Sequence, residues 1–194
     1  IKDEFLVLNK NQKIIITNTI FQHIKSKRYS AVNNYGKSKT KTYEILKKYC
    51  IKKRIKFKSF FITNPWGIFE EKKLNYHLIK NWLQNKVPVV KYPKYIRDNI
   101  FINKLSDQYY NLIFSRSKKE EYFPSGYCST NRVFINALKR EFNKYFKKNA
   151  KVKFIDNMKH EQPLVRINGK KIFKKIYFKE NLKKYFDYYK KRLS

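Results

Sequence analysis

Residues 13 to 21 read KIIITNTIF, and our prediction of the fold begins with them. The run is apolar, short and rich in β-branched residues, which is typical of a buried β-strand. Residues 22–34 are polar and predict a loop, and residues 35–53 carry apolar side chains at helical spacing. Residues 55–63, IKFKSFFIT, have the features of a second strand. Strand, loop, helix and strand in this order predict a βαβ unit with a parallel sheet, and therefore an α/β protein.

The rest of the chain alternates between helical and extended patterns. The tetrapeptide Asn64-Pro65-Trp66-Gly67 is a strong turn signal. Residues 96–103 alternate between apolar and polar in the manner of an edge strand. We expect further extended segments at 87–93 and 151–155, and helices at 74–84, 105–114, 131–146 and 180–193. We find no internal repeat and no linker, so we predict one compact unit over residues 1–194.

The composition predicts a globular protein without a metal site. Of the 194 residues, 42% are hydrophobic and 18% aromatic, which is enough to form a core. No apolar run approaches the roughly 20 residues of a membrane span, and no signal peptide is recognisable. We therefore expect a cytoplasmic protein without membrane contact, and the two cysteines, Cys50 and Cys128, agree with a reducing compartment. The three histidines, His23, His77 and His160, are too scattered to hold a metal ion.

The formal net charge of +33 attracts anionic partners, but by itself it is weak evidence for a nucleic-acid-binding protein. Only 8 of the 47 basic residues are arginine, the usual reader of guanine edges. The lysines lie throughout the chain beside abundant Ile, Asn, Tyr and Phe, and this profile is typical of a coding bias toward A and T. The charge alone does not lead us to expect nucleic acid as a partner.

The predicted helix at residues 35–53 opens with two side chains suited to acid–base chemistry. Tyr35 and Lys39 are four residues apart and therefore lie on one face of the helix. A free phenol titrates at about pH 10 and is a poor base at neutral pH, but a nearby ammonium favours the phenolate. The spacing alone is a weak motif, since the chain contains other tyrosine–lysine pairs like it. The preceding strand, however, ends at Thr17 and Thr19, and the carboxyl edge of a parallel sheet is where ligands bind.

This arrangement resembles the extended short-chain dehydrogenase/reductases, and within them the NAD-dependent epimerase/dehydratase family that acts on nucleotide sugars. YGKSKTKTYE resembles that family's Tyr-x-x-Ser-Lys helix, and FFITNPWGIFE resembles its strand and proline-containing loop near the nicotinamide. KYIRDNIFIN is similar to its Arg-Asp-x-Ile segment, and FPSGYCS to its strand-to-helix step in the substrate lobe. These pieces follow the family's order over residues 13–130, and QPLVRIN (162–168) is a weaker match.

The resemblance implies an incomplete Rossmann-like parallel sheet with helices in residues 1–70, and a small α+β substrate lobe mainly in residues 71–194. It implies a nucleotide-sugar epimerase or ketoreductase that uses NAD or NADP as cofactor. The implied partner is a nucleotide-sugar substrate, and the resemblance allows a homodimer.

The resemblance also assigns catalytic roles. Tyr35 would exchange a proton with a sugar hydroxyl or ketone, and Lys39 would tune it and hold the nicotinamide ribose. Thr19 would hydrogen-bond the reacting sugar oxygen, and a strand-end hydroxyl without function is its plain alternative.

Three further residues would bind the cofactor or the substrate. Pro65 would flank the nicotinamide, although a turn proline needs no function. Arg97 would contact the substrate phosphate, with a surface ion pair to Asp98 as the alternative. Arg166 is a second phosphate candidate, for which a structural role is the stronger reading.

The sequence departs from the family's pattern in two places. The only glycines are Gly36, Gly67, Gly126 and Gly169. The glycine-rich loop that receives the dinucleotide pyrophosphate is therefore absent, and we expect the C-terminal part of an epimerase-like protein whose activity needs the missing portion. Ile20 and Phe21 follow Thr19, where the dehydratases of the family carry acidic residues, and this favours epimerisation or ketone reduction.

Two other readings stay open. A basic nucleic-acid-binding protein would stack bases on its tyrosine and phenylalanine side chains, and its lysines would gather on one face. A catalytically inactive homologue would have the same fold and no turnover. The enzyme reading predicts instead that Thr19, Tyr35 and Lys39 converge at a sheet edge.

Overall fold

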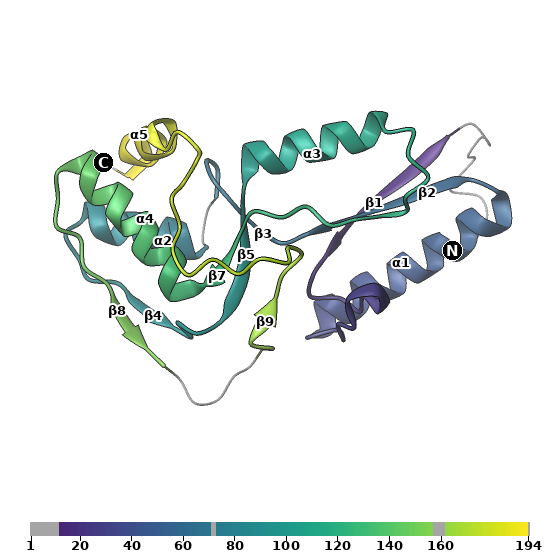
Figure 1. Ribbon diagram of the computed structural model, residues 1–194, viewed down its shortest axis with the longest axis horizontal. Helices are drawn as coiled ribbons and strands as arrows, with labels where there is room; N and C mark the ends of the chain where they lie inside the picture. Colours follow the sequence, from purple (N-terminus) through teal and green to yellow (C-terminus); the bar gives the residue numbers. More distant parts are fainter. Residues whose placement is uncertain (1–11, 71–72, 157–161, 194) are drawn as a thin grey trace. The chain divides into compact units, whose positions relative to one another are not determined.

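The computed structural model describes residues 12–70, 73–156 and 162–193, and the chain folds as two units (Figure 1). The first unit holds the described residues up to Ile62 together with Gln108–Pro124. The second unit holds the rest of the described chain. From the sequence we predict the change near residue 70, whereas the chain leaves the first unit after Ile62 and returns to it at Gln108.

The first unit contains a parallel sheet. Strand β1 (Lys13–Thr19) pairs with β2 (Lys56–Ile62), and the chain between them forms the short 3-10 helix η2 (Lys25–Lys27) and then α1 (Asn34–Lys53). Strand β6 (Glu121–Tyr122) also pairs in parallel with β2, which gives the order β1-β2-β6. The predicted βαβ unit and the α/β class are therefore confirmed.

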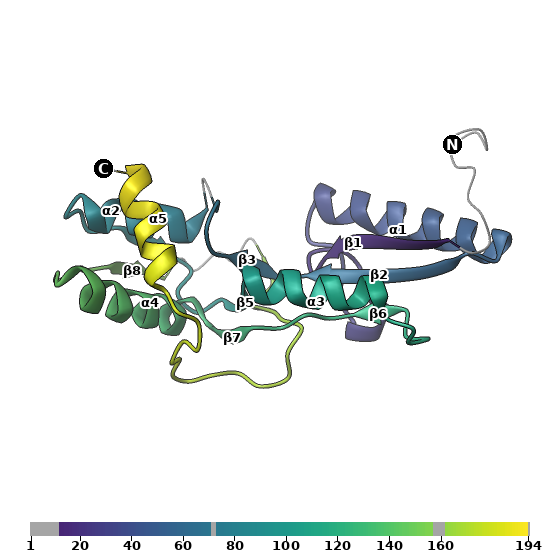
Figure 2. The same cartoon turned by 90° about the horizontal axis from the view of Figure 1, so that it is seen from above.

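The two faces of β2 pack against different helices, because successive side chains of a strand point to opposite faces. Phe57 faces Tyr43 of α1, with 5.7 Å between the ring centroids. Phe60 faces Tyr109 of α3 (Ile102–Phe114), with 5.1 Å between the ring centroids, in the part of α3 that belongs to the first unit. Figure 2 shows α1 and this end of α3 on opposite sides of β1 and β2.

Helix α1 begins one residue earlier than the sequence analysis predicts, because Asn33 caps it. The Asn33 side chain accepts a hydrogen bond of 2.9 Å from the backbone N–H of Gly36, which satisfies one of the free donors of the first turn. Gly36 is buried, and a Cβ at this position would lie 2.2 Å from the carbonyl oxygen of Phe21. Only glycine allows the first turn of α1 to approach the chain leaving β1 so closely.

The second unit contains a mixed sheet with β5 (Ile96–Phe101) at its centre. β5 pairs antiparallel with β7 (Tyr127–Thr130), and in parallel with β3 (Asn64–Trp66) and β9 (Val165–Arg166). The prediction of an edge strand at residues 96–103 is therefore wrong. Its three polar residues, Arg97, Asp98 and Asn99, are consecutive, and all three are buried inside the sheet.

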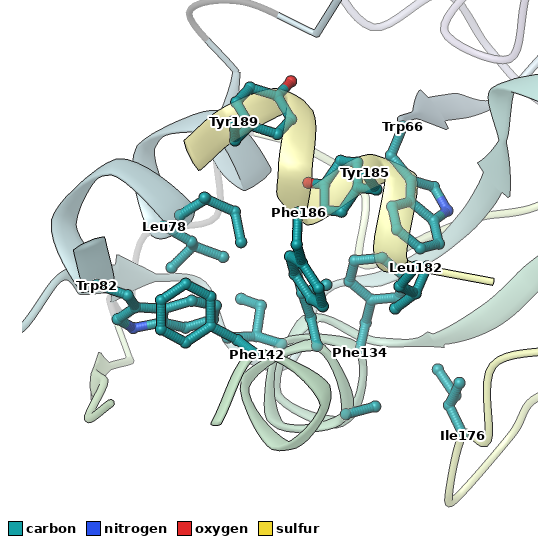
Figure 3. Close-up of a cluster of buried hydrophobic side chains, with 14 of the residues drawn as sticks. Trp66, Leu78, Trp82, Phe134, Phe142, Ile176, Leu182, Tyr185, Phe186 and Tyr189 are labelled. Atoms are coloured by element: carbon teal, nitrogen blue, oxygen red, sulfur yellow. The ribbon is translucent and has the colours of Figure 1, made fainter. Parts of the chain in front are cut away.

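Three helices of the second unit share an aromatic core. They are α2 (Leu74–Leu83), α4 (Asn131–Phe146) and α5 (Lys183–Leu193), each within a few residues of its predicted range. Figure 3 shows Trp82 and Phe142 side by side, with 5.2 Å between their ring centroids, and Phe186 close to them. Aromatic side chains bury large apolar areas, so this cluster supplies much of the driving force for folding of the unit.

Polar contacts fix the last helix and a second pair of strands. The Tyr189 hydroxyl of α5 donates to the carbonyl oxygens of Gly67 and Glu70, at 3.1 and 2.6 Å. Strand β4 (Val89–Lys91) pairs in parallel with β8 (Lys153–Ile155).

In the part of the chain that the structure describes, no helix has the length and apolar character that crossing a membrane requires.

Both cysteines are buried and free, as the composition suggests. Burial raises the pKa of the Cys50 thiol, and burial together with the charge of Asp98 raises the pKa of Cys128 to about 11. A raised pKa disfavours the reactive thiolate, so neither residue has the properties of a catalytic cysteine.

Candidate active site

The carboxyl end of β1 carries the predicted hydroxyl. Thr19 is the last residue of the strand and is 8% exposed. Its Oγ1 accepts a hydrogen bond of 3.3 Å from the backbone N–H of Phe21, and its own N–H donates to Oε1 of Gln22 at 3.2 Å. The register pairs Thr19 with Ile62, so β1 and β2 end at the same edge of the sheet. The hydroxyl therefore lies at the edge where the sequence analysis expects it.

Helix α1 carries Tyr35 and Lys39 beside this edge. The Lys39 ammonium donates a hydrogen bond of 3.3 Å to the backbone carbonyl oxygen of Thr17, two residues before β1 ends. Tyr35 lies one turn before Lys39 and is 56% exposed, so its phenol is not packed in the interior. The close approach at Gly36 holds this first turn against the chain that follows Thr19. The catalytic roles of Thr19, Tyr35 and Lys39 remain predictions.

Asn18 is a polar residue at the same edge that the sequence analysis missed as a candidate. It is 2% exposed, and neither its side-chain oxygen nor its side-chain nitrogen has a hydrogen-bond partner among the described residues. A buried amide without partners costs free energy, so it is suited to a polar ligand that reaches it. An asparagine between two threonines in a strand end is the only signal that the sequence offers for it.

In the second unit, the two candidate arginines are neighbours. Arg97 of β5 and Arg166 of β9 are directly opposite in the parallel register and are 4% and 3% exposed. The Arg97 guanidinium lies over the Tyr95 ring, 4.3 Å from its centroid, and donates at 3.0 Å to the carbonyl oxygen of Leu164. Burial lowers the pKa of Arg97 to about 10, and the positive charge of Arg166 contributes to this effect. Two like charges buried side by side favour an anionic ligand.

Asp98 does not form the surface ion pair that was the alternative reading of Arg97. It is fully buried, and its carboxylate accepts hydrogen bonds from three backbone N–H groups: Gly126 at 2.7 Å, Asn168 at 3.0 Å and Gly169 at 3.1 Å. Among the described residues, no ion pair joins Asp98 to an arginine. Asp98 therefore connects β5 to two distant loops, and that reading of Arg97 is wrong.

Pro65 lies in β3 rather than in the predicted turn. It pairs with Ile100 of β5 and is partly exposed, and the turn follows at Gly67, whose φ is 150°. The structure thus shows Pro65 three residues after the end of β2, and its role beside a nicotinamide remains a prediction.

The described residues fit part of a nicotinamide cofactor. Tyr35 and Lys39 carry a phenol and an ammonium beside the carboxyl edge of the sheet, where such cofactors bind in open α/β folds, and the buried amide of Asn18 lies near the end of the same strand. The glycine-rich loop for a pyrophosphate does not occur in the sequence. No group of three or more His, Cys, Asp or Glu side chains suited to a metal ion occurs among the described residues.

No protein-family model matches the sequence, and no curated protein matches it in a sequence search. The fold, however, matches that of solved nucleotide-sugar epimerases and dehydratases that were determined with NAD bound. The resemblance found in the sequence is therefore confirmed at the level of the fold.

Three solved structures illustrate the match. One is a UDP-glucuronic acid 4-epimerase from Bacillus cereus in complex with UDP-glucuronic acid and NAD, at 15% identity and a TM-score of 0.69, with 94% of this chain and 64% of that chain covered. Another is a UDP-glucose 4-epimerase from Thermotoga maritima with UDP-glucose, at 17% identity and a TM-score of 0.68, with the same coverage. The third is a dTDP-glucose 4,6-dehydratase from Bacillus anthracis in complex with NAD, at 16% identity and a TM-score of 0.68, with 92% and 62% covered. The chain thus spans less than two thirds of their length.

Proposed function

We propose that this protein is a nucleotide-sugar epimerase or ketoreductase that uses NAD or NADP. The observation that carries the proposal is the hydrogen bond from Lys39 to Thr17, which holds the helix with Tyr35 against the carboxyl end of a parallel strand. The shared fold with epimerases and dehydratases supports the same class of chemistry.

Tyr35 is the proposed acid–base residue. Its exposed phenol exchanges a proton with a hydroxyl or ketone of the sugar, and Lys39, one turn away, holds the nicotinamide ribose in this proposal. Thr19 holds the reacting oxygen by a hydrogen bond in this proposal. The nicotinamide, when bound, supplies the hydride chemistry.

Arg97 and Arg166 are the proposed partners of the substrate's phosphates. They are buried and adjacent, and a diphosphate would offset the repulsion between two neighbouring positive charges. Arginine suits this task because its planar fork of donors matches the geometry of a phosphate.

Epimerisation or ketone reduction is favoured over dehydration. The two residues after Thr19 are Ile20, which is fully buried, and Phe21, which is partly buried. Neither has a group that can take or give a proton, so the removal of water from the sugar has no acid–base partner at these positions.

A turnover assay tests the proposal. The chain is combined with a glycine-rich dinucleotide-binding portion, fused to it or added as a separate segment, and incubated with NAD or NADP and a panel of UDP- and dTDP-sugars, and the products are separated by chromatography. We expect conversion by the wild type and a loss of about 100-fold or more with Tyr35→Phe. Tyr177→Phe, which changes another exposed tyrosine, is the matched control and should keep full turnover.

Binding of the nucleotide sugar, measured by calorimetry without turnover, gives a second result. Arg97→Gln should weaken binding about 10-fold or more, whereas Arg132→Gln, at an exposed arginine of α4, should not change it. Equal turnover of Tyr35→Phe and wild type would overturn the proposal. Tight substrate binding without any turnover by the wild type would identify an inactive homologue instead.

A further inference from the structure

A hollow of about 770 Å³ lies in the first unit at the amino ends of the parallel strands. Lys13 and Lys56, which begin β1 and β2 and pair in register, both line it. Thr19 ends β1 six residues later, roughly 20 Å along the strand. The hollow is therefore separate from the proposed site of proton transfer, and the proposed function does not use it.

Basic side chains dominate the lining of this hollow. Six of them are Lys13, Lys56, Lys58, Arg116, Lys118 and Lys119. Among the described residues, none of these six forms an ion pair with a carboxylate. The single acidic residue of the lining, Glu120, is already paired with Lys47 at 2.9 Å. Six cations thus surround one hollow, and a concave basic surface attracts anions more strongly than scattered lysines do.

One of these cations, Lys58, is buried rather than exposed on the surface. It is 6% exposed, and its ammonium donates to the carbonyl oxygen of Ser115 at 2.9 Å and to the hydroxyl of Tyr122 at 3.4 Å. Both partners are neutral. A buried ammonium with neutral partners only is costly, and an anion in the hollow would offset part of that cost.

Exposed apolar side chains lie beside these cations. Phe114 and Ile51 line the hollow, and each is 67% exposed. Tyr110, one turn earlier on α3, is 63% exposed, and its ring lies 4.7 Å from that of Phe114. Aromatic faces next to a basic groove are the combination that single-stranded nucleic acids use, because bases stack on the rings while phosphates meet the cations.

We propose that this hollow binds a single-stranded nucleic acid. The phosphates lie against the cations that begin β1 and β2 and those of the 115–119 loop, and one base stacks on Phe114. A double helix keeps its bases stacked inside, so it cannot place one on this ring. The net charge alone did not favour such a partner, but the hollow brings the cations and the aromatic faces together.

Binding of a fluorescein-labelled decathymidylate, measured by anisotropy over a range of salt concentrations, tests the proposal. The triple variant Lys56→Gln, Lys118→Gln, Lys119→Gln removes three exposed cations of the hollow. Its matched control, Lys170→Gln, Lys174→Gln, Lys179→Gln, removes the same charge from exposed lysines of the second unit. Each phosphate neutralised on a single strand contributes about −0.7 to the slope of log K against log salt concentration. The triple variant of the hollow should therefore make this slope less negative by about 2 and weaken binding at least about 10-fold.

The matched control should keep the slope and most of the affinity. Phe114→Ala should weaken binding about 10-fold and leave the salt slope unchanged, because it removes stacking and no charge. Circular dichroism confirms that each variant is folded. Equal weakening by both triple variants would overturn the proposal, because it would show attraction to net charge only. Equally tight binding of a duplex of the same length would also overturn the proposal. A third contradicting result is that tripolyphosphate competes as well as the oligonucleotide while Phe114→Ala has no effect.

Discussion

The ammonium of Lys39 lies 3.3 Å from the backbone carbonyl oxygen of Thr17, so a side chain of α1 is attached near the carboxyl end of strand β1. The two residues are 22 positions apart in the sequence and come together because α1 packs along the strand that precedes it. Any loss of this contact frees the Lys39 side chain without removing the helix.

Lys39→Ala should therefore separate catalysis from stability. Turnover should fall by about 100-fold or more, because the site loses the ammonium that is proposed to hold the nicotinamide ribose beside Tyr35. The free energy of unfolding should fall by less than about 1 kcal/mol, because a single partly buried hydrogen bond is lost. Urea unfolding and the turnover assay measure the two effects, and Lys37→Ala at an exposed position of α1 serves as control.

Gly36→Ala should destabilise the protein by at least about 2 kcal/mol. An added Cβ would lie 2.2 Å from the carbonyl oxygen of Phe21, and backbone on both sides limits the adjustment. Helix propensity alone predicts the opposite sign, because alanine stabilises a helix interior relative to glycine by about 0.5–1 kcal/mol. An unchanged or higher midpoint in urea for Gly36→Ala would refute the close approach.

Asp98→Ala should lower the free energy of unfolding by about 3 kcal/mol or more, because three backbone N–H groups lose a buried, charged hydrogen-bond acceptor. Asp98→Asn should have an intermediate effect, since the amide retains one acceptor oxygen. Thermal unfolding of both variants tests this, with Asp107→Ala, an exposed carboxylate on α3, as the control expected to remain close to wild type.

Glu70 should make the stability fall as the pH rises from about 4.5 to 7. Burial raises its pKa from 4.5 to about 7, despite the charge of Lys73 and the hydrogen bond from Asn75. Because the folded pKa lies above the unfolded one, the folded state binds more protons between these values, and stability decreases with pH there.

The loss should reach about 3 kcal/mol and level off above pH 7. Glu70→Gln should remove this pH-dependent loss of stability. The stability of the variant relative to the wild type should therefore increase from pH 4.5 to pH 8. Urea unfolding at both pH values measures the difference, and Glu44→Gln at an exposed position should show no such trend. A constant difference between Glu70→Gln and wild type would contradict the raised pKa.

Local patterns predicted the elements well where one face of an element is buried. The run at residues 13–21 and the helical spacing of residues 35–53 identified β1 and α1, because the side-chain period of a strand or helix is visible in the local order of apolar and polar residues. Residues 96–103 were misread as an edge strand, because Arg97 and Asp98 look exposed in a linear pattern although both are buried. The short strands β6 and β9 carry too few residues to show any period.

By itself, the sequence determined that Tyr35 and Lys39 share a face of one helix after a parallel strand, because both facts depend on residues close together in the chain. Only the tertiary structure decided which distant residues meet. Strand pairing placed Arg97 opposite Arg166, and the return of the chain after residue 107 brought Lys119 to the same hollow as Lys56. Such pairs are set by the packing of the whole core rather than by local periodicity, and the two anion sites proposed in this protein are built from them.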